Sequence, residues 1–230
     1  MASEDIAVEA SLKTSGLGSA EATDDGVVPV IDLSASDAAQ QLWKAATEVG
    51  FFSIINHGIA QSLIDGAFQE SQDFFEQPLE DKKTQSPGDM SVNCGFEHFS
   101  QVRPSTGVAD QKESLQITAR EGSMNGRWPS DRFEKSATSL LAASHELANK
   151  LLDLLEPQAV PQVKSGTLSK SHNLWSPEGQ CTLRFLHYTA QEKETTRALL
   201  KEGYWRAGPH TDWDNLTLLY QRPGQAGLEV

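Results

Sequence analysis

Residues 207–213 read Ala-Gly-Pro-His-Thr-Asp-Trp and place an imidazole and a carboxylate two positions apart. If this segment is a β-strand, His210 and Asp212 point to the same face, because side chains alternate along a strand. One histidine and one carboxylate are two of the three ligands of the facial triad that binds non-haem Fe(II). The pattern therefore predicts His210 and Asp212 as metal ligands, although a His-x-Asp triplet alone is also typical of surface turns.

A second strand is predicted upstream, over residues 181–188, which read Cys-Thr-Leu-Arg-Phe-Leu-His-Tyr. Alternation places Arg184, Leu186 and Tyr188 on one face of this strand, and Leu183, Phe185 and His187 on the other. His187 therefore points away from Tyr188. It is a poor candidate for the third metal ligand.

The amino-terminal half alternates short apolar runs with helical periodicity. The pattern predicts a strand over 28–33, a helix from a cap at Ser36 to a stop at Gly50, a buried strand over 51–55, and a helix ending before Pro78. His57 falls in a predicted turn. Residues 84–110 are rich in Ser, Pro, Gly and Gln, and indicate a flexible loop that is either a lid or disordered.

The middle of the chain predicts a strand over 111–118 and a long helix over about 130–155 with one apolar stripe. His145 falls within this helix, where a partly exposed histidine is expected rather than a ligand. The two cysteines, Cys94 and Cys181, have no metal-binding spacing and are expected to be reduced thiols.

Composition narrows the class of protein. The 230 residues are 38% hydrophobic, with a mean hydropathy of -0.44 and no apolar run of membrane-spanning length. A formal net charge of -13 argues against nucleic acid or an anionic membrane as a partner, so a small-molecule substrate is expected. Residues 1–26 read as a disordered acidic tail and not as a secretory signal, which makes a cytoplasmic location the default expectation.

The ordered set of motifs resembles the iron- and 2-oxoglutarate-dependent oxygenases of the isopenicillin N synthase-like family. The resemblance covers roughly residues 27–230 and rests on these stretches: Val-Pro-Val-Ile-Asp-Leu at 28–33, Gly-Phe-Phe-Ser-Ile-Ile-Asn-His-Gly-Ile at 50–59, Phe-Phe-Glu-Gln-Pro at 74–78, the strand at 181–188, Gly-Pro-His-Thr-Asp at 208–212, and Asn-Leu-Thr-Leu-Leu-Tyr-Gln at 215–221.

The resemblance implies an α+β fold, with a mixed helix and strand region leading into an incomplete double-stranded β-helix, or jelly roll. Residues 27–120 would form the amino-terminal oxygenase-type domain, residues 121–179 a long helix and connection, and residues 180–230 the first half of the catalytic core.

The resemblance also implies the chemistry of the site. Fe(II) would be held by His210 and Asp212, 2-oxoglutarate would be the cosubstrate, and ascorbate a supporting reductant. Tyr188 would place its hydroxyl near the cosubstrate carboxylate, or would be a rim aromatic; Arg184 would line the same pocket, or would be an outward or ion-paired arginine. Lys112 and Glu113 match a charged pair common in the family, or form a solvated strand face.

No histidine follows Asp212, and the family's distal histidine and its Arg-x-Ser would lie beyond Val230. We therefore expect a fragment of a longer protein or a degenerate relative, without 2-oxoglutarate turnover in the chain as given. Two alternatives stay open: an iron-dependent oxidase that does not use 2-oxoglutarate, and a non-catalytic interaction protein derived from an oxygenase. The sequence determines neither the substrate, nor the choice among hydroxylation, desaturation and cyclisation, nor the oligomeric state.

Overall fold

The computed structural model describes residues 28–102, 109–195, 206–207, 210, 212, 214–225 and 228. Its elements, in chain order, are β1 (Val30–Asp32), α2 (Ala38–Glu48), β2 (Ser53–Ile55), α3 (Gln61–Phe75), α4 (Leu79–Gln85), β3 (Gly95–His98), β4 (Glu113–Thr118), α5 (Asp131–Ala159), α6 (Thr167–Lys170) and β5 (Thr182–His187). The predicted acidic tail lies outside the described residues.

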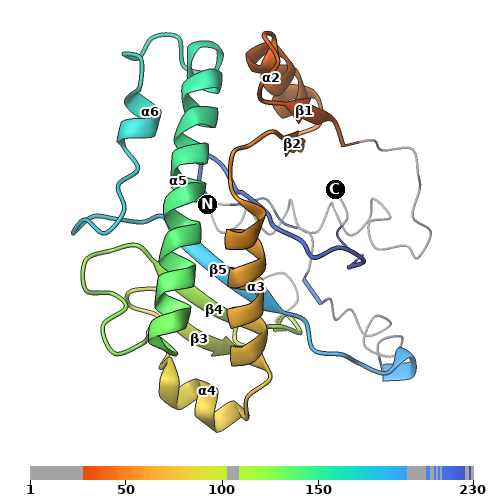
Figure 1. Cartoon of the computed structure of the whole chain (residues 1–230), viewed down its shortest axis with the longest axis vertical. Coiled ribbons are helices and arrows are strands. Elements are labelled where there is room, and N and C mark those ends of the chain that lie inside the picture. Colours follow the sequence, from red (N-terminus) through yellow and green to blue (C-terminus); the bar gives the residue numbers. More distant parts are fainter. Residues whose placement is uncertain are drawn as a thin grey trace.

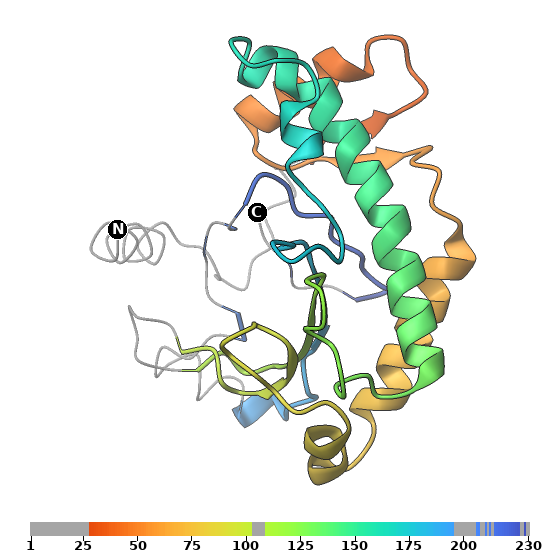
Figure 2. The same ribbon diagram turned by 90° about the vertical axis from the view of Figure 1, so that its left-hand side faces the viewer.

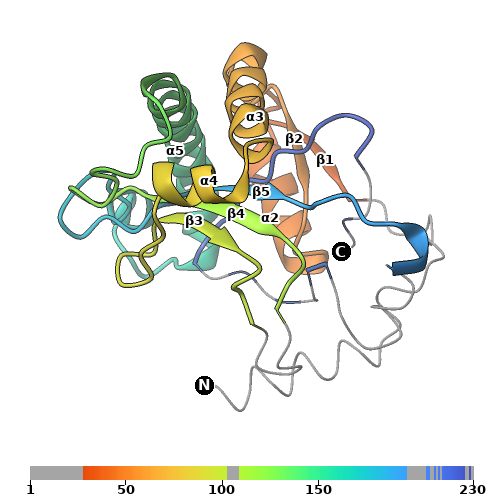
Figure 3. The ribbon, with the colours of Figure 1, turned by 90° about the horizontal axis from the view of Figure 1, so that it is seen from below.

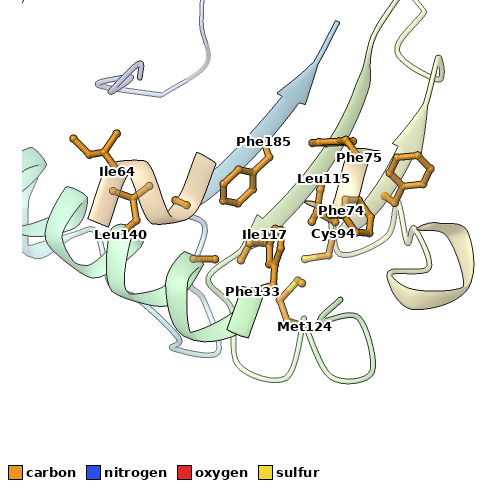
Figure 4. Close-up of a cluster of buried hydrophobic side chains, with 13 residues drawn as sticks. Ile64, Phe74, Phe75, Cys94, Leu115, Ile117, Met124, Phe133, Leu140 and Phe185 are labelled. Atoms are coloured by element: carbon orange, nitrogen blue, oxygen red, sulfur yellow. The ribbon is translucent and has the colours of Figure 1, made fainter. Parts of the chain in front are cut away.

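The larger sheet has the order β3-β4-β5, with both pairs antiparallel. Helices α3 and α5 pack against each other and cover one face of this sheet (Figures 1 and 3). Between them lies the larger hydrophobic core, in which Phe74 of α3, Leu115 of β4, Phe133 of α5 and Phe185 of β5 are buried (Figure 4). The α+β prediction is confirmed.

The smaller sheet is a parallel pair, β1 and β2. Together with α2 and the second half of α5 it encloses a second core, in which Ile31, Leu42, Leu147 and Leu151 are buried. Helix α5 therefore serves both cores, and its 29 residues reach about 43 Å at 1.5 Å per residue.

Local sequence explains where α5 begins. The Ser130 hydroxyl accepts a hydrogen bond of 3.1 Å from the Phe133 backbone N–H, which satisfies one free donor of the first turn. Asp131 and Glu134 add negative charge next to the positive end of the helix dipole. Among the described residues no helix is long and apolar enough to span a membrane.

The sequence predicted a buried strand over 51–55; a strand is present, but the prediction that it is buried is wrong. The strand itself is shorter, and Phe51 and Ile55 are 51% and 48% exposed. A two-stranded sheet covered on one face covers only alternate side chains, here Phe52 and Ile54, which are half-buried against the second core. The helix before it begins after Asp37 rather than Ser36.

The prediction of a flexible loop over 84–110 is also wrong in its middle part, where β3 pairs with β4. Phe96 is buried in the larger core and anchors this short strand. The polar composition around it concealed a four-residue strand that carries only one large apolar side chain. Residues 103–108 lie outside the described part.

Residues 180–230 were expected to begin a β-rich core, and β5 does so. The segment 215–221, by contrast, forms no strand. A strand needs a neighbour for its backbone groups, and no described strand pairs with this segment. It is held instead by side chains: the hydroxyls of Tyr220 and Ser144 are 2.9 Å apart, and Arg222 donates to Gln72 of α3 at 2.8 Å. Figure 2 shows this dark blue segment running between the smaller sheet and the larger one.

Candidate metal and cosubstrate site

The two predicted metal ligands lie close together. The Nε2 atom of His210 is 3.3 Å from Oδ1 of Asp212, and the two side chains are 45% and 54% exposed. The expectation that both project to one side is consistent with this distance. His210 and Asp212 themselves are not assigned to a strand, however. Gly208, Pro209, Thr211 and Trp213 lie outside the described residues.

Residues on both sides of the motif contact other parts of the chain. On the amino-terminal side, the Arg206 guanidinium lies 5.7 Å from the centre of the Tyr188 ring and donates a hydrogen bond to the Thr189 carbonyl. On the carboxy-terminal side, His172 Nε2 is 3.5 Å from Asp214 Oδ1 and 3.3 Å from Asn215 Nδ2. Arg206 thus contacts the end of β5, and Asp214 and Asn215 contact the loop after α6.

The donor types suit a ferrous ion. An imidazole nitrogen and a carboxylate oxygen are two of the three ligands of a facial triad. Among the residues that the structure describes, no group of three or more His, Cys, Asp and Glu could hold a metal ion. Whether His210 and Asp212 bind a metal therefore stays a prediction, and no third ligand beside them is found among the described residues.

Strand β5 presents its side chains as predicted. Phe185 and His187 face the helices: the Phe185 ring is 5.1 Å from that of Phe133, and the His187 ring is 5.2 Å from that of Phe75. His187 therefore points away from the candidate site, as expected.

Arg184, on the opposite face of β5, is half-buried. Burial lowers the pKa of its guanidinium, and the Glu97 carboxylate partly offsets this. Tyr188 follows directly after β5, is exposed, and has the Arg206 guanidinium over its ring. Whether the two side chains contact a cosubstrate stays a prediction.

The alternative reading of Lys112 and Glu113 as a solvated strand face is wrong, because both residues are buried. Both carboxylate oxygens of Glu113 accept hydrogen bonds from Lys82 Nζ, at 2.9 and 2.8 Å. His187 Nδ1 lies 3.1 Å from the same carboxylate, and His98 Nε2 lies 3.6 Å from it. Glu113 begins a strand that alternates polar and apolar residues, so the sequence signalled neither its burial nor Lys82 as its partner.

The remaining histidines and cysteines are structural, as predicted. His57 Nδ1 accepts from the Ile59 backbone N–H at 3.1 Å within a turn, and His145 is half-buried in α5 with Nε2 3.0 Å from Asn149 Nδ2. Cys94 and Cys181 are free thiols. Burial raises the pKa of Cys181, and the nearby Asp214 carboxylate raises it further.

Comparison with known proteins finds sequences and a fold that are similar to this chain. The family model described as non-haem dioxygenase in morphine synthesis N-terminal matches residues 28–135. Gibberellin 2-beta-dioxygenase 4 of Arabidopsis thaliana is 29% identical over 217 residues, covering 90% of this chain and 63% of that protein. The 2-oxoglutarate-Fe(II) type oxidoreductase hxnY of Emericella nidulans is 28% identical, covering 84% of this chain and 60% of that protein.

Among solved structures, a full-length Neurospora crassa protein crystallised in complex with alpha-KG superposes with a TM-score of 0.65 at 21% identity, covering 84% of this chain and 63% of that one. This likeness shows a shared fold. The chain thus spans less than two thirds of the length of each of these three relatives. Residues 28–135 thus match the amino-terminal family model of the non-haem dioxygenases, and over most of its length the chain is similar in sequence and in fold to iron- and 2-oxoglutarate-dependent oxygenases.

Proposed function

We propose that the protein is a non-haem Fe(II)- and 2-oxoglutarate-dependent oxygenase that acts on a small molecule, with His210 and Asp212 as two of its iron ligands. The observation that carries this proposal is the 3.3 Å approach of an imidazole nitrogen and a carboxylate oxygen in a chain that is similar to such oxygenases. Support comes from the relatives: one is named a gibberellin dioxygenase, and the Neurospora crassa structure contains alpha-KG.

Each residue has a definite part in the proposal. When bound, Fe(II) supplies open coordination positions for a cosubstrate and O2. His210 would hold the ion through Nε2 and Asp212 through its carboxylate. The Tyr188 hydroxyl and the Arg184 guanidinium are proposed to orient the carboxylates of 2-oxoglutarate, and stacking on Arg206 restricts the Tyr188 ring. A net charge of -13 supports a small-molecule partner rather than nucleic acid, and we propose a cytoplasmic location.

Iron binding tests the ligand assignment directly. We expect the 230-residue polypeptide to bind Fe(II) under anaerobic conditions, measured by isothermal titration calorimetry, more weakly than a three-ligand site would. His210→Ala and Asp212→Ala should each abolish the heat of binding. His57→Asn, a change at a turn histidine, is the matched control and should leave it unchanged. Equal affinities for wild type and His210→Ala would contradict the assignment.

Cosubstrate binding separates the three candidate functions. The proposed oxygenase should bind 2-oxoglutarate only once Fe(II) is present, and Tyr188→Phe or Arg184→Met should weaken that binding. Binding of Fe(II) without 2-oxoglutarate favours an iron-dependent oxidase, and binding of neither favours an interaction protein. With two ligands in the described residues, we expect no succinate from this polypeptide; succinate above the level of a His210→Ala control would refute that.

A further inference from the structure

The face of the larger sheet that points away from α3 and α5 is polar. Register places Glu97 of β3 opposite Ser114 of β4, and Gln116 of β4 opposite Arg184 of β5. Their neighbours along these strands, including Leu115 and Phe185, fill the core on the helix side, so alternation directs these four to the other side. Figure 3 shows both helices on one side of the sheet.

Gln116 is the most unusual member of this face. It is 2% exposed, and its Oε1 atom has no hydrogen-bond partner. A buried carbonyl oxygen without a partner is destabilising, and native structures hold few of them. Such an atom is explained if a ligand supplies the missing donor.

Glu97 has unused hydrogen-bonding capacity on the same face. The residue is 8% exposed. Its Oε2 accepts three long hydrogen bonds, of 3.4 Å from Ser100 and from Gln101 and of 3.3 Å from Ser114. Within the described part of the chain no hydrogen bond reaches its Oε1, and none is made by the Arg184 side chain, which interacts with Glu97 electrostatically.

We propose that Glu97, Gln116 and Arg184 recognise a small molecule that carries an N–H donor beside a carbonyl acceptor, as the edge of a cyclic amide or imide does. The free oxygens of Glu97 and Gln116 can accept hydrogen bonds from N–H groups, and the Arg184 guanidinium can donate to a carbonyl oxygen. The five N–H donors of a guanidinium allow Arg184 to contact both this molecule and the cosubstrate. This inference deepens the proposed function, on which it rests, by giving the substrate class. Tyr188, directly after β5, contacts Arg206 ahead of the His-x-Asp motif.

The same face disfavours a hydrocarbon substrate. Covering a carboxylate and an unpaired amide oxygen with apolar surface removes their water without replacing its hydrogen bonds. Sites built from buried polar groups discriminate strongly against analogues that lack the matching hydrogen-bonding group. The face should therefore separate two ligands of the same shape by their N–H groups alone.

Uracil, a simple cyclic imide, and 1,3-dimethyluracil, which lacks both N–H donors, provide this test. We expect the metal-free 230-residue chain to bind uracil in a saturation-transfer NMR titration. It should bind 1,3-dimethyluracil at least about tenfold more weakly, the scale of one lost hydrogen bond to a buried group. Gln116→Leu and Glu97→Gln should each weaken uracil binding by a similar factor. Gln40→Leu, at an exposed position of α2, is the control and should not.

Thermal stability separates recognition from a structural role. If Gln116 is kept for a ligand, Gln116→Leu removes an unpaired buried acceptor and should raise Tm while it weakens uracil binding. A lowered Tm with uracil binding intact would overturn the proposal, and so would equal binding of the two uracils. Glu97→Gln, which replaces one oxygen by an amide group of the same size, keeps the test valid if Gln116→Leu fails to fold. Because the assay contains no iron, its failure is distinguishable from failure of the iron site.

Discussion

At the scale of single residues, Glu113 joins four elements through one buried carboxylate. It lies on β4 and meets Lys82 of α4, His187 of β5 and His98 of β3. Lys82 also donates to the Phe75 carbonyl at 3.1 Å, so its ammonium has further hydrogen-bonding partners in the protein interior. Removing one partner of such a hydrogen-bonded buried pair destabilises the fold strongly, because the other charge stays buried without compensation.

We predict that Lys82→Met lowers the free energy of unfolding by about 3–5 kcal/mol, because it leaves the Glu113 charge buried without its main partner. The double variant Lys82→Met with Glu113→Leu should recover much of this loss. Urea denaturation measures both. Lys83→Met removes the exposed pair with Glu80 and should cost less than about 1 kcal/mol. A Lys82→Met effect as small as that of Lys83→Met would contradict the prediction.

His145 gives a pH dependence of known sign. Burial, and secondarily the nearby charge of His172, lower its pKa below 6.5 in the folded protein. The unfolded chain therefore binds a proton first as the pH falls, so this residue's effect on stability is absent well above pH 6.5 and increasingly unfavourable below it. Between pH 7.5 and 5.5, approximately the range around that value, His145→Gln should reduce the decline in unfolding free energy. An unchanged slope in that variant would show that other groups cause the decline.

At the scale of elements, the start of β3 depends on a glycine. Gly95 has φ of 91°, and a Cβ there would lie 2.3 Å from the Pro87 carbonyl oxygen. Gly50 has a similar φ of 82° but open space around it. Gly50→Ala should thus cost about 1–2 kcal/mol, the penalty for a left-handed alanine.

Gly95→Ala should cost clearly more than Gly50→Ala, because the backbone of β3 or of Pro87 must also move. The difference in unfolding free energy between the two variants isolates the collision from the conformational strain. Equal losses would mean that the chain near Pro87 yields easily.

The elements also show which features a sequence can reveal. Helix α5 and strand β5 were predictable, because long helical periodicity and a six-residue alternation are strong local signals. Strand β3 was not, since four residues with one large apolar side chain carry no period. The exposure of Phe51 and Ile55 depends on which faces of a two-stranded sheet find neighbours, which is a tertiary fact.

At the scale of the whole molecule, the same distinction applies to the site. The approach of His210 and Asp212 was predictable because the two residues are close in sequence. The polar face of Glu97, Gln116 and Arg184 was not, because it arises only when three strands far apart in sequence pair in one register. The Lys82–Glu113 pair escaped prediction for the same reason, since 31 positions separate its partners.

The two cores that share α5 differ in size, and this difference bears on the metal ligands. Leu216 and Leu218, just after the His-x-Asp motif, pack against the smaller core, while Tyr220 packs against the larger one. Small cores open more readily than large ones through partial unfolding of the native state. Transient opening of the smaller core would therefore release the ligand-bearing segment while the larger sheet stays folded. An ion held by His210 and Asp212 would bind only when this segment is in place, so it would stabilise the folded smaller core. We therefore expect iron to slow amide hydrogen exchange in β1 and β2, which contain neither ligand.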